Sequence, residues 1–207
     1  FLFNRKVWEH RSDARFHELE YNLHLLRAVG CDVGEGKIYP ELSVSPVATE
    51  RSKHLLRELG IGGNYTFAVL HPGSGRSARD WSAANFGMLG RRLAELPDVK
   101  VLVVGGKREQ RIVTEVQSYM APGTSTLVDR LTLRDYAALL RQASLFVANS
   151  TGPIHIAAAV GTPVIGLYPQ VTALSARRWG PYTDRKTIFS PVDKPENCGK
   201  CLFQKGV

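Results

Sequence analysis

From residue 65 onward, short apolar runs alternate with longer amphipathic segments. The apolar runs, rich in Val, Leu, Ile and Phe, predict strands at 65–71, 99–104, 125–128, 144–148, 163–168 and 186–190. Apolar residues three and four positions apart predict helices between the first five strands, at about 82–96, 107–120, 132–142 and 152–160. Strands that alternate with helices predict a parallel sheet covered on both faces, which is an α/β doubly wound fold.

The first 63 residues show a different pattern. Apolar positions at helical spacing predict a helix within 11–29, and Ser45 followed by Pro46 predicts a second helix that runs to Leu59. These two helices cannot form a complete core alone, so we expect them to pack on something else. The chain is therefore divided into a mostly helical interdomain or N-terminal-domain remnant, a sheet domain and a tail, at 1–63, 64–190 and 191–207.

The loop after the fourth predicted strand is the first candidate site. It reads NSTGPIH over residues 149–155, and Pro153 fits the first helical turn, where a missing N–H costs nothing. Backbone amides at a helix N-terminus, with the helix dipole behind them, attract an anion. We expect an anionic ligand to be bound by Ser150, Thr151, Gly152 and His155. The alternative is that the two hydroxyl residues only cap the helix and that the histidine is an ordinary polar residue.

The loop after the first predicted strand is the second candidate, and reads HPGSGRSARD over residues 71–80. Glycines permit close approach of backbone amides to a phosphate, and guanidinium groups can bind two phosphate oxygens. The residues expected to do so are Gly73, Ser74, Gly75, Arg76 and Arg79. In the common strand order 3-2-1-4-5-6, the first and fourth strands are neighbours where the order reverses, so both loops flank one crevice. A solvated basic loop is the alternative interpretation.

Two acidic residues follow the next strands. Glu109 comes after the second strand and could accept hydrogen bonds from ribose hydroxyls, or it could be a first-turn acid that favours the helix dipole. Asp129 follows the third strand, and we interpret it as structural.

A competing function has to be weighed. Gly73, Gly75 and Ala78 match the G-x-G-x-x-A fingerprint of dinucleotide-binding proteins. The helix does not open on these glycines, however, and the second strand ends in Gly-Gly-Lys without an acid to bind a ribose. An NAD(P)-dependent oxidoreductase therefore stays as the alternative function.

Charge favours anionic partners. The 27 Lys and Arg residues against 19 Asp and Glu give a net charge of +8, which suits phosphorylated ligands, nucleic acid or an anionic membrane surface. The basic residues are scattered, so we rank phosphate-bearing small molecules first and expect no nucleic acid. A non-catalytic module that binds phosphate or nucleic acid is the third alternative.

Several features bear on the compartment. No run is long and apolar enough to span a membrane, and residues 1–10 are too polar for a signal peptide. The three cysteines form no even disulfide set. Cys198 and Cys201 supply two ligands where a structural zinc site needs four, so we expect reduced thiols. The first residues look like mid-sequence, and we expect a fragment.

Three segments together carry a family resemblance. HPGSG…ARDWSAANF, VVGGKREQ and NSTGPIHIAAAVGTPVIGLYP resemble the bacterial heptosyltransferases of glycosyltransferase family 9, over roughly residues 65–190. The segment HELEYNLHLLRAVG also looks like the stretch that joins the two domains of that family. The resemblance implies the Rossmann-like C-terminal domain of a GT-B glycosyltransferase. It also implies ADP-heptose as the donor and inverting transfer of heptose to the lipopolysaccharide inner core.

The resemblance assigns roles to individual residues. Arg79 stands where the family commonly has a lysine beside the diphosphate, and Glu109 matches the acid associated with the ribose. Thr151, Gly152 and His155 match the diphosphate loop, and Arg79 and His155 would stabilise the leaving group. Ser150 departs from the family pattern, which usually has Asp there.

The resemblance also implies what lies elsewhere. The acceptor-binding N-terminal domain and the catalytic base would precede residue 1, so the isolated chain is expected to be inactive and its catalytic residue is unknown. We expect no cofactor and no obligatory metal. The expected partners are a nucleotide-sugar donor, the lipopolysaccharide core acceptor and the missing domain. The expected location is cytoplasmic, with peripheral contact at the inner membrane as a hypothesis.

Overall fold

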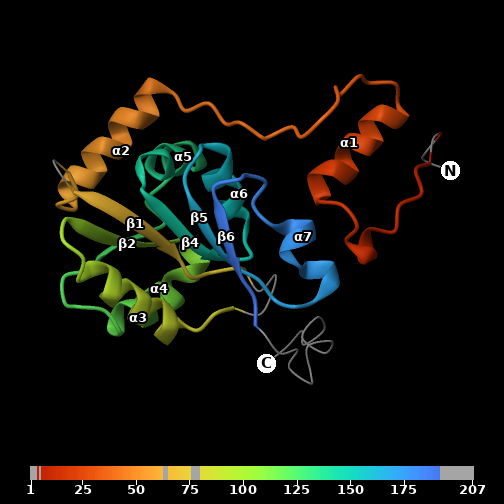
Figure 1. Ribbon diagram of the computed structural model, residues 1–207. Helices are drawn as coiled ribbons and strands as arrows, with labels where there is room; N and C mark the ends of the chain where they lie inside the picture. Colours follow the sequence, from red (N-terminus) through yellow and green to blue (C-terminus); the bar gives the residue numbers. More distant parts are fainter. Residues whose placement is uncertain (1–3, 5, 63–64, 76–79, 192–207) are drawn as a thin grey trace.

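Six parallel strands form one sheet in the computed structural model, which describes residues 4, 6–62, 65–75 and 80–191 (Figure 1). The strand order is β3-β2-β1-β4-β5-β6. The strands are β1 (Thr66–His71), β2 (Val99–Gly105), β3 (Ser125–Val128), β4 (Leu145–Asn149), β5 (Val164–Leu167) and β6 (Lys186–Phe189). The predicted doubly wound order is confirmed, and β1 pairs directly with β4 where the order reverses.

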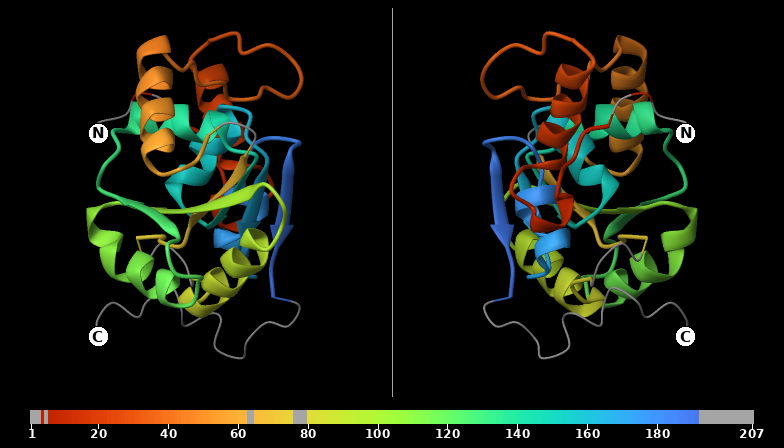
Figure 2. Two further views of the ribbon diagram at one scale, coloured as in Figure 1. Left: turned by 90° about the vertical axis from the view of Figure 1, so that its left-hand side faces the viewer. Right: turned by 90° about the vertical axis from the view of Figure 1, so that its right-hand side faces the viewer.

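Helices cover both faces of this sheet (Figures 1 and 2). On one face α3 (Ala83–Ala94) packs beside α4 (Gln110–Ser118), and on the other lie α2 (Pro46–Glu58), α5 (Leu133–Gln142) and α6 (Gly152–Ala159). Neighbouring strand residues serve opposite cores: Val69 packs into the α5 side and Leu70 into the α3 side. Because both faces of the central strands β1, β2 and β4 are buried, these strands read as continuous apolar runs instead of alternating ones.

Helix α2 shares the core of the sheet domain. Leu56 lies in the same buried cluster as the strand residues on that face. The amide of Gln142 in α5 donates to the hydroxyl of Ser52, and Nε of Arg51 donates to Asp135 at 2.9 Å. The helix that we expected to pack on another part of the protein therefore packs on α5. The division of the chain at residue 63 stays a prediction.

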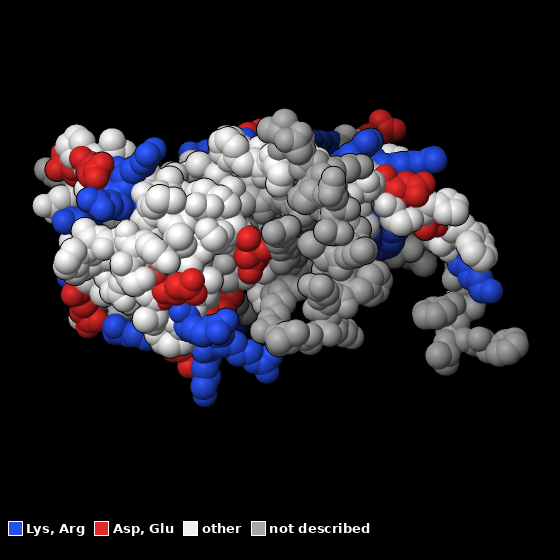
Figure 3. Space-filling view, turned by 90° about the horizontal axis from the view of Figure 1, so that it is seen from below, with Lys and Arg blue, Asp and Glu red and all other residues white. Residues whose placement is uncertain are grey.

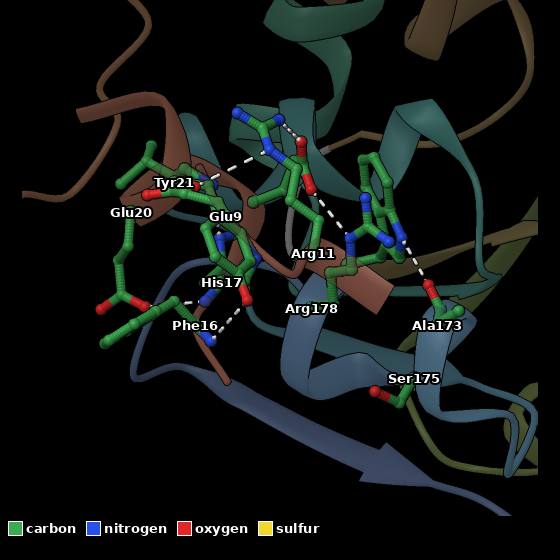
Figure 4. A network of polar contacts seen from close by, with 12 residues as sticks. Glu9, Arg11, Phe16, His17, Glu20, Tyr21, Ala173, Ser175 and Arg178 are labelled. Carbon is green, nitrogen blue, oxygen red and sulfur yellow. Dashed lines mark hydrogen bonds and ion pairs between the residues drawn. The ribbon is translucent and has the colours of Figure 1, made fainter. Parts of the chain in front are cut away.

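The N-terminal segment lies near α6 and α7, at the end of the molecule away from α2 (Figure 1). It contains η1 (Arg11–Asp13) and α1 (Glu18–Ala28), and it lies beside η3 (Thr172–Leu174) and α7 (Ala176–Trp179). Figure 4 shows the polar network between them: Nε of Arg178 donates to Glu18 at 2.8 Å, and Arg11 binds the same carboxylate.

The helix predicted within 11–29 begins late. His17 caps α1 by accepting a hydrogen bond from the amide of Leu19 at 3.1 Å, while Glu20 accepts one from the amide of His17 at 2.7 Å. This reciprocal pairing satisfies two amides that would lack partners at the helix start. The predicted helix at 107–120 similarly opens as the short 3₁₀ turn η2 (Lys107–Glu109). In the described ranges, no helix is long and apolar enough to cross a membrane.

Candidate functional site

A cavity of about 340 Å³ opens at the carboxyl ends of the central strands. Its lining combines residues from the loops after β1, β2, β3 and β4, including Ser74, Gly75, Glu109, Asp129 and Thr151. Because β1 and β4 are adjacent, the two predicted loops contribute to one cavity at the reversal of strand order. The predicted residues Arg76 and Arg79, together with Ala78, lie outside the described residues.

Glu109 is held in a fixed orientation in this cavity. Its Oε2 accepts a hydrogen bond from the amide of Gly106 at 2.7 Å and lies 3.4 Å from Nε2 of His71. The contact with His71, helped by the Gly106 amide, lowers the pKa of Glu109 below its usual value, against the opposite effect of burial. Glu109 is therefore an ionised, acceptor-only group at neutral pH.

We expect Glu109→Gln to lose more stability at pH 7 than at low pH. A carboxyl whose folded-state pKa is depressed stabilises the fold above its unfolded pKa of about 4.3, and the effect disappears as pH falls through the folded value. Urea unfolding at pH 7, 5 and 3.5 would measure the difference between variant and wild type. Glu115→Gln, at an exposed position of α4, is the control. A difference that does not change with pH would contradict the electrostatic origin.

Gly73 makes room for Glu109. A Cβ atom at residue 73 would lie 1.9 Å from Oε1 and 2.3 Å from Cδ of Glu109. The predicted phosphate-binding role of this glycine stays untested, but the structure gives it a packing role that the sequence did not reveal. Gly75 differs, because its φ of +61° is a left-handed conformation that glycine adopts without strain.

Asn149 joins the two loops. This buried residue at the end of β4 donates from Nδ2 to the carbonyl of Pro72 at 2.7 Å, and its Oδ1 accepts from the amide of Trp81 at 2.9 Å. The indole of Trp81 lies edge-on to Phe86 of α3, with ring centroids 5.1 Å apart. One side chain therefore fixes both ends of the β1–α3 loop. Sequence reasoning treated Asn149 only as the first residue of the loop after the fourth strand.

The start of α6 presents open backbone to the cavity. Thr151 is the N-cap residue, but its side chain accepts no hydrogen bond from the first turn, so the capping interpretation does not describe it. A Cβ atom at Gly152 would meet no described atom within 4 Å, so packing does not require glycine there. The amide of Gly152 and the unobstructed approach at this helix start suit an anion, although Pro153 has no N–H and the amide of Ile154 donates to the carbonyl of Thr151 at 3.3 Å.

Ser150 and His155 face other neighbours. Ser150 is hydrogen-bonded to the hydroxyl of Tyr168, whose pKa is raised by burial. His155 lines a second cavity of about 350 Å³ together with His17 and Tyr182, between α1, α6 and α7. Burial lowers the pKa of His155, which favours the neutral ring. The structure therefore does not bring His155 into the cavity of Glu109, and its predicted contact with the same ligand stays a prediction.

Two acids were underestimated or missed. Asp129, which we interpreted as structural, lines the main cavity, and its amide also donates to the carbonyl of Gly105 at 3.1 Å. Asp80 lies near Glu109: burial and that charge raise its pKa, while a hydrogen bond with Ser74 opposes the rise. Across the ranges that the structure describes, no three His, Cys, Asp or Glu side chains are grouped so that they could hold a metal ion.

The surface charge is dispersed on the face shown in Figure 3. Lys and Arg side chains form small groups with Asp and Glu beside them, and a broad uncharged area lies between. A dense basic stripe, which non-specific nucleic-acid binding requires, is not visible among the described residues of that face.

Sequence comparison identifies relatives along most of the chain. Residues 2–205 match glycosyltransferase family 9 (heptosyltransferase). A putative glycosyltransferase of Haemophilus influenzae is 33% identical over 189 residues, which are 88% of this chain and 54% of that protein. Lipopolysaccharide heptosyltransferase 3 of Escherichia coli is 29% identical over 163 residues, which are 78% of this chain and 47% of that protein. The chain thus spans about half the length of these curated relatives.

Solved structures share the fold. A family 9 glycosyl transferase from Veillonella parvula superposes with a TM-score of 0.75 at 18% identity, covering 86% of this chain and 49% of that one. The E. coli heptosyltransferase WaaC with ADP gives a TM-score of 0.59 at 20% identity, covering 91% of this chain and 53% of that one. The expected Rossmann-like α/β architecture of a GT-B enzyme is confirmed. Together with the match over residues 2–205, these findings show that the chain belongs to glycosyltransferase family 9, the heptosyltransferase family.

Proposed function

We propose that this chain is the donor-binding half of a glycosyltransferase that takes heptose from ADP-heptose and transfers it, with inversion, to the lipopolysaccharide inner core. The observation that carries the proposal is the shared cavity, in which an ionised Glu109 and the open start of α6 line the same space. A nucleoside diphosphate needs both features: an acceptor for ribose hydroxyls and amide donors for phosphate oxygens.

The two sides of the cavity are proposed to bind different parts of the ligand. The carboxylate of Glu109 can accept from two vicinal hydroxyls, which suits a ribose. The hydroxyl of Thr151 and the amide of Gly152 at the start of α6 suit the diphosphate, and Gly152 has no side chain to obstruct its approach. Ser74 and Gly75 close the cavity from the β1 side.

Leaving-group stabilisation is the chemical contribution proposed for this half. As the glycosidic bond breaks, negative charge develops on the departing ADP, and preorganised amide donors bind that charge more strongly than the ground state. Arg79 and His155 are proposed to add to this effect. An acceptor hydroxyl also needs a positioned base, which we propose is supplied together with the acceptor site by the part of the protein that precedes residue 1.

Ligand binding tests the proposal on the chain itself. ADP at a hundred times its dissociation constant should stabilise the fold by about 2.7 kcal/mol without added metal. UDP, GDP or NAD at the same concentration should stabilise it less. Gly152→Ala should weaken ADP binding without loss of stability, because its Cβ would meet no described atom within 4 Å and would stand at the helix start where the diphosphate is proposed to bind. Gly62→Ala is the matched control, since its Cβ would meet only a side-chain carbon of Arg57 at 3.6 Å.

Two outcomes would redirect the proposal. A thermal shift with NAD alone would favour the oxidoreductase alternative. The absence of a shift with every nucleoside diphosphate would contradict a donor-binding role for this chain.

A further inference from the structure

A buried chain of polar side chains lies behind Glu109. The hydroxyl of Tyr136, at the start of α5, lies 3.0 Å from Nδ1 of His71, at the end of β1. Nε2 of His71 then lies 3.4 Å from Oε2 of Glu109. Tyr136 is 8% exposed and His71 only 4%. Polar groups this deeply buried are costly unless each finds a partner, so the alignment of three is a specific arrangement.

Tyr136 determines whether the nitrogen of His71 that faces the carboxylate carries a proton. Burial raises the pKa of Tyr136 well above its usual value, so it stays a neutral hydroxyl that can donate to Nδ1. With Nδ1 as acceptor, the single proton of a neutral imidazole lies on Nε2. In a charged imidazolium both nitrogens carry protons, and the hydroxyl accepts instead. In either state, Nε2 donates toward Glu109.

The two named contacts of the Glu109 carboxylate involve only one of its oxygens. Both named contacts, from the Gly106 amide and from His71, reach Oε2. Oε1 lies over Gly73, where a side chain would displace it. Among the described residues, these contacts fix the plane of the carboxylate and leave Oε1 as the oxygen that a ligand hydroxyl can reach.

We infer that His71 is a positioning residue: supported by Tyr136, it orients the Glu109 carboxylate toward the two vicinal hydroxyls of a ribose. The inference rests on the proposed function and deepens it, because it names what makes the site selective for a diol. A glutamate without this support has freely rotating side-chain bonds, and ordering them on binding would reduce the affinity gained from the hydroxyls.

A matched pair of substitutions at one position tests the inference. The amide of His71→Asn can replace Nδ1 and keep the contact with Tyr136, but it is too short to reach Glu109. The longer His71→Gln can place an N–H where Nε2 lies. Isothermal titration would measure the affinities of ADP and of 2′,3′-dideoxy-ADP, which lacks both hydroxyls, on the full 207-residue chain.

The readout is the preference for ADP over its dideoxy analogue. Since hydrogen bonds to a charged acceptor are strong, we expect wild type to prefer ADP by about tenfold or more. His71→Asn should reduce this ratio to about one to three, with the affinity for the analogue nearly unchanged, and His71→Gln should restore most of it. In a Glu109→Gln background, His71→Asn should have no further effect on the ratio.

Other results would overturn the inference. One is an unchanged ratio of ADP affinity to analogue affinity in His71→Asn. Another is equal weakening of both ligands in that variant, which would indicate a merely structural role. If His71→Asn does not fold, Tyr136→Phe tests the same point: it should lower the ratio partially, and an unchanged ratio would count against the inference. Failure of wild type to bind ADP at all would instead overturn the proposed function. If wild type binds ADP and every variant keeps the wild-type preference for ADP over the dideoxy analogue, only the role of His71 is overturned.

Discussion

Replacing Asn149 with alanine is expected to lower the free energy of unfolding by about 2–4 kcal/mol. The substitution removes one donor and one acceptor at a residue that is 1% exposed. It leaves the carbonyl of Pro72 and the amide of Trp81 without their partners, and burial without a partner costs about 1–3 kcal/mol per group. Urea unfolding followed by circular dichroism measures the effect. ADP affinity should fall as well, because the β1–α3 loop is no longer fixed at both ends.

Asn149→Asp separates the two bonds. An aspartate keeps an acceptor for the amide of Trp81, but it cannot donate to the carbonyl of Pro72 and places a negative charge against that oxygen. We therefore expect at least as large a loss at neutral pH. Asn85→Ala in α3 is the control, because the side chain of Asn85 makes no hydrogen bond among the described residues. A loss below about 0.5 kcal/mol in Asn149→Ala would show that the bridge adds nothing net to stability.

Much of the sheet domain is predictable because its signals are local. The strands lie within one or two residues of their expected bounds, since a parallel strand buried on both faces needs an unbroken apolar run. Three predicted helix starts, at Ser45, Ser82 and Thr132, carry side chains that accept from the first turn. The remaining differences arise from tertiary contacts. The short α7 forms where Arg178 reaches Glu18 of α1, 160 positions away in the sequence.

The site is predictable to the level of loops but not of side-chain roles. Strand order alone brings the loops after β1 and β4 together, and the cavity lies there. The supporting residues His71, Tyr136 and Asn149 were not identified, because their partners lie 65 to 77 positions away in the sequence. One signal was available: two of them are polar residues at the last position of a buried apolar strand, where a packed core excludes a polar side chain that lacks a partner.

Replacing Gly73 with alanine is expected to weaken ADP binding by about tenfold or more, while lowering the stability at pH 7 by no more than Glu109→Gln does. The added Cβ would overlap Oε1, Cδ and Cγ of Glu109, so the side chain of Glu109 would have to rotate away from residue 73. Gly73 has no positive φ, so alanine introduces no backbone strain. The fold should therefore tolerate the change, whereas the orientation of Glu109 should not. Titration with ADP and thermal unfolding measure the two effects separately.

A double-mutant cycle with Glu109→Ala distinguishes the two roles that Gly73 can have. If the glycine only makes room for the carboxylate, Gly73→Ala should cost no further affinity once that carboxylate is gone, and it should hardly affect 2′,3′-dideoxy-ADP in the wild-type background. If its backbone instead approaches a phosphate, as the glycine pattern of the loop suggested, the cost should persist in Glu109→Ala and should be equal for both ligands. Independent effects of the two substitutions would therefore contradict the packing role. Complete coupling would show that Gly73 acts through the carboxylate of Glu109, which His71 and the Gly106 amide also contact.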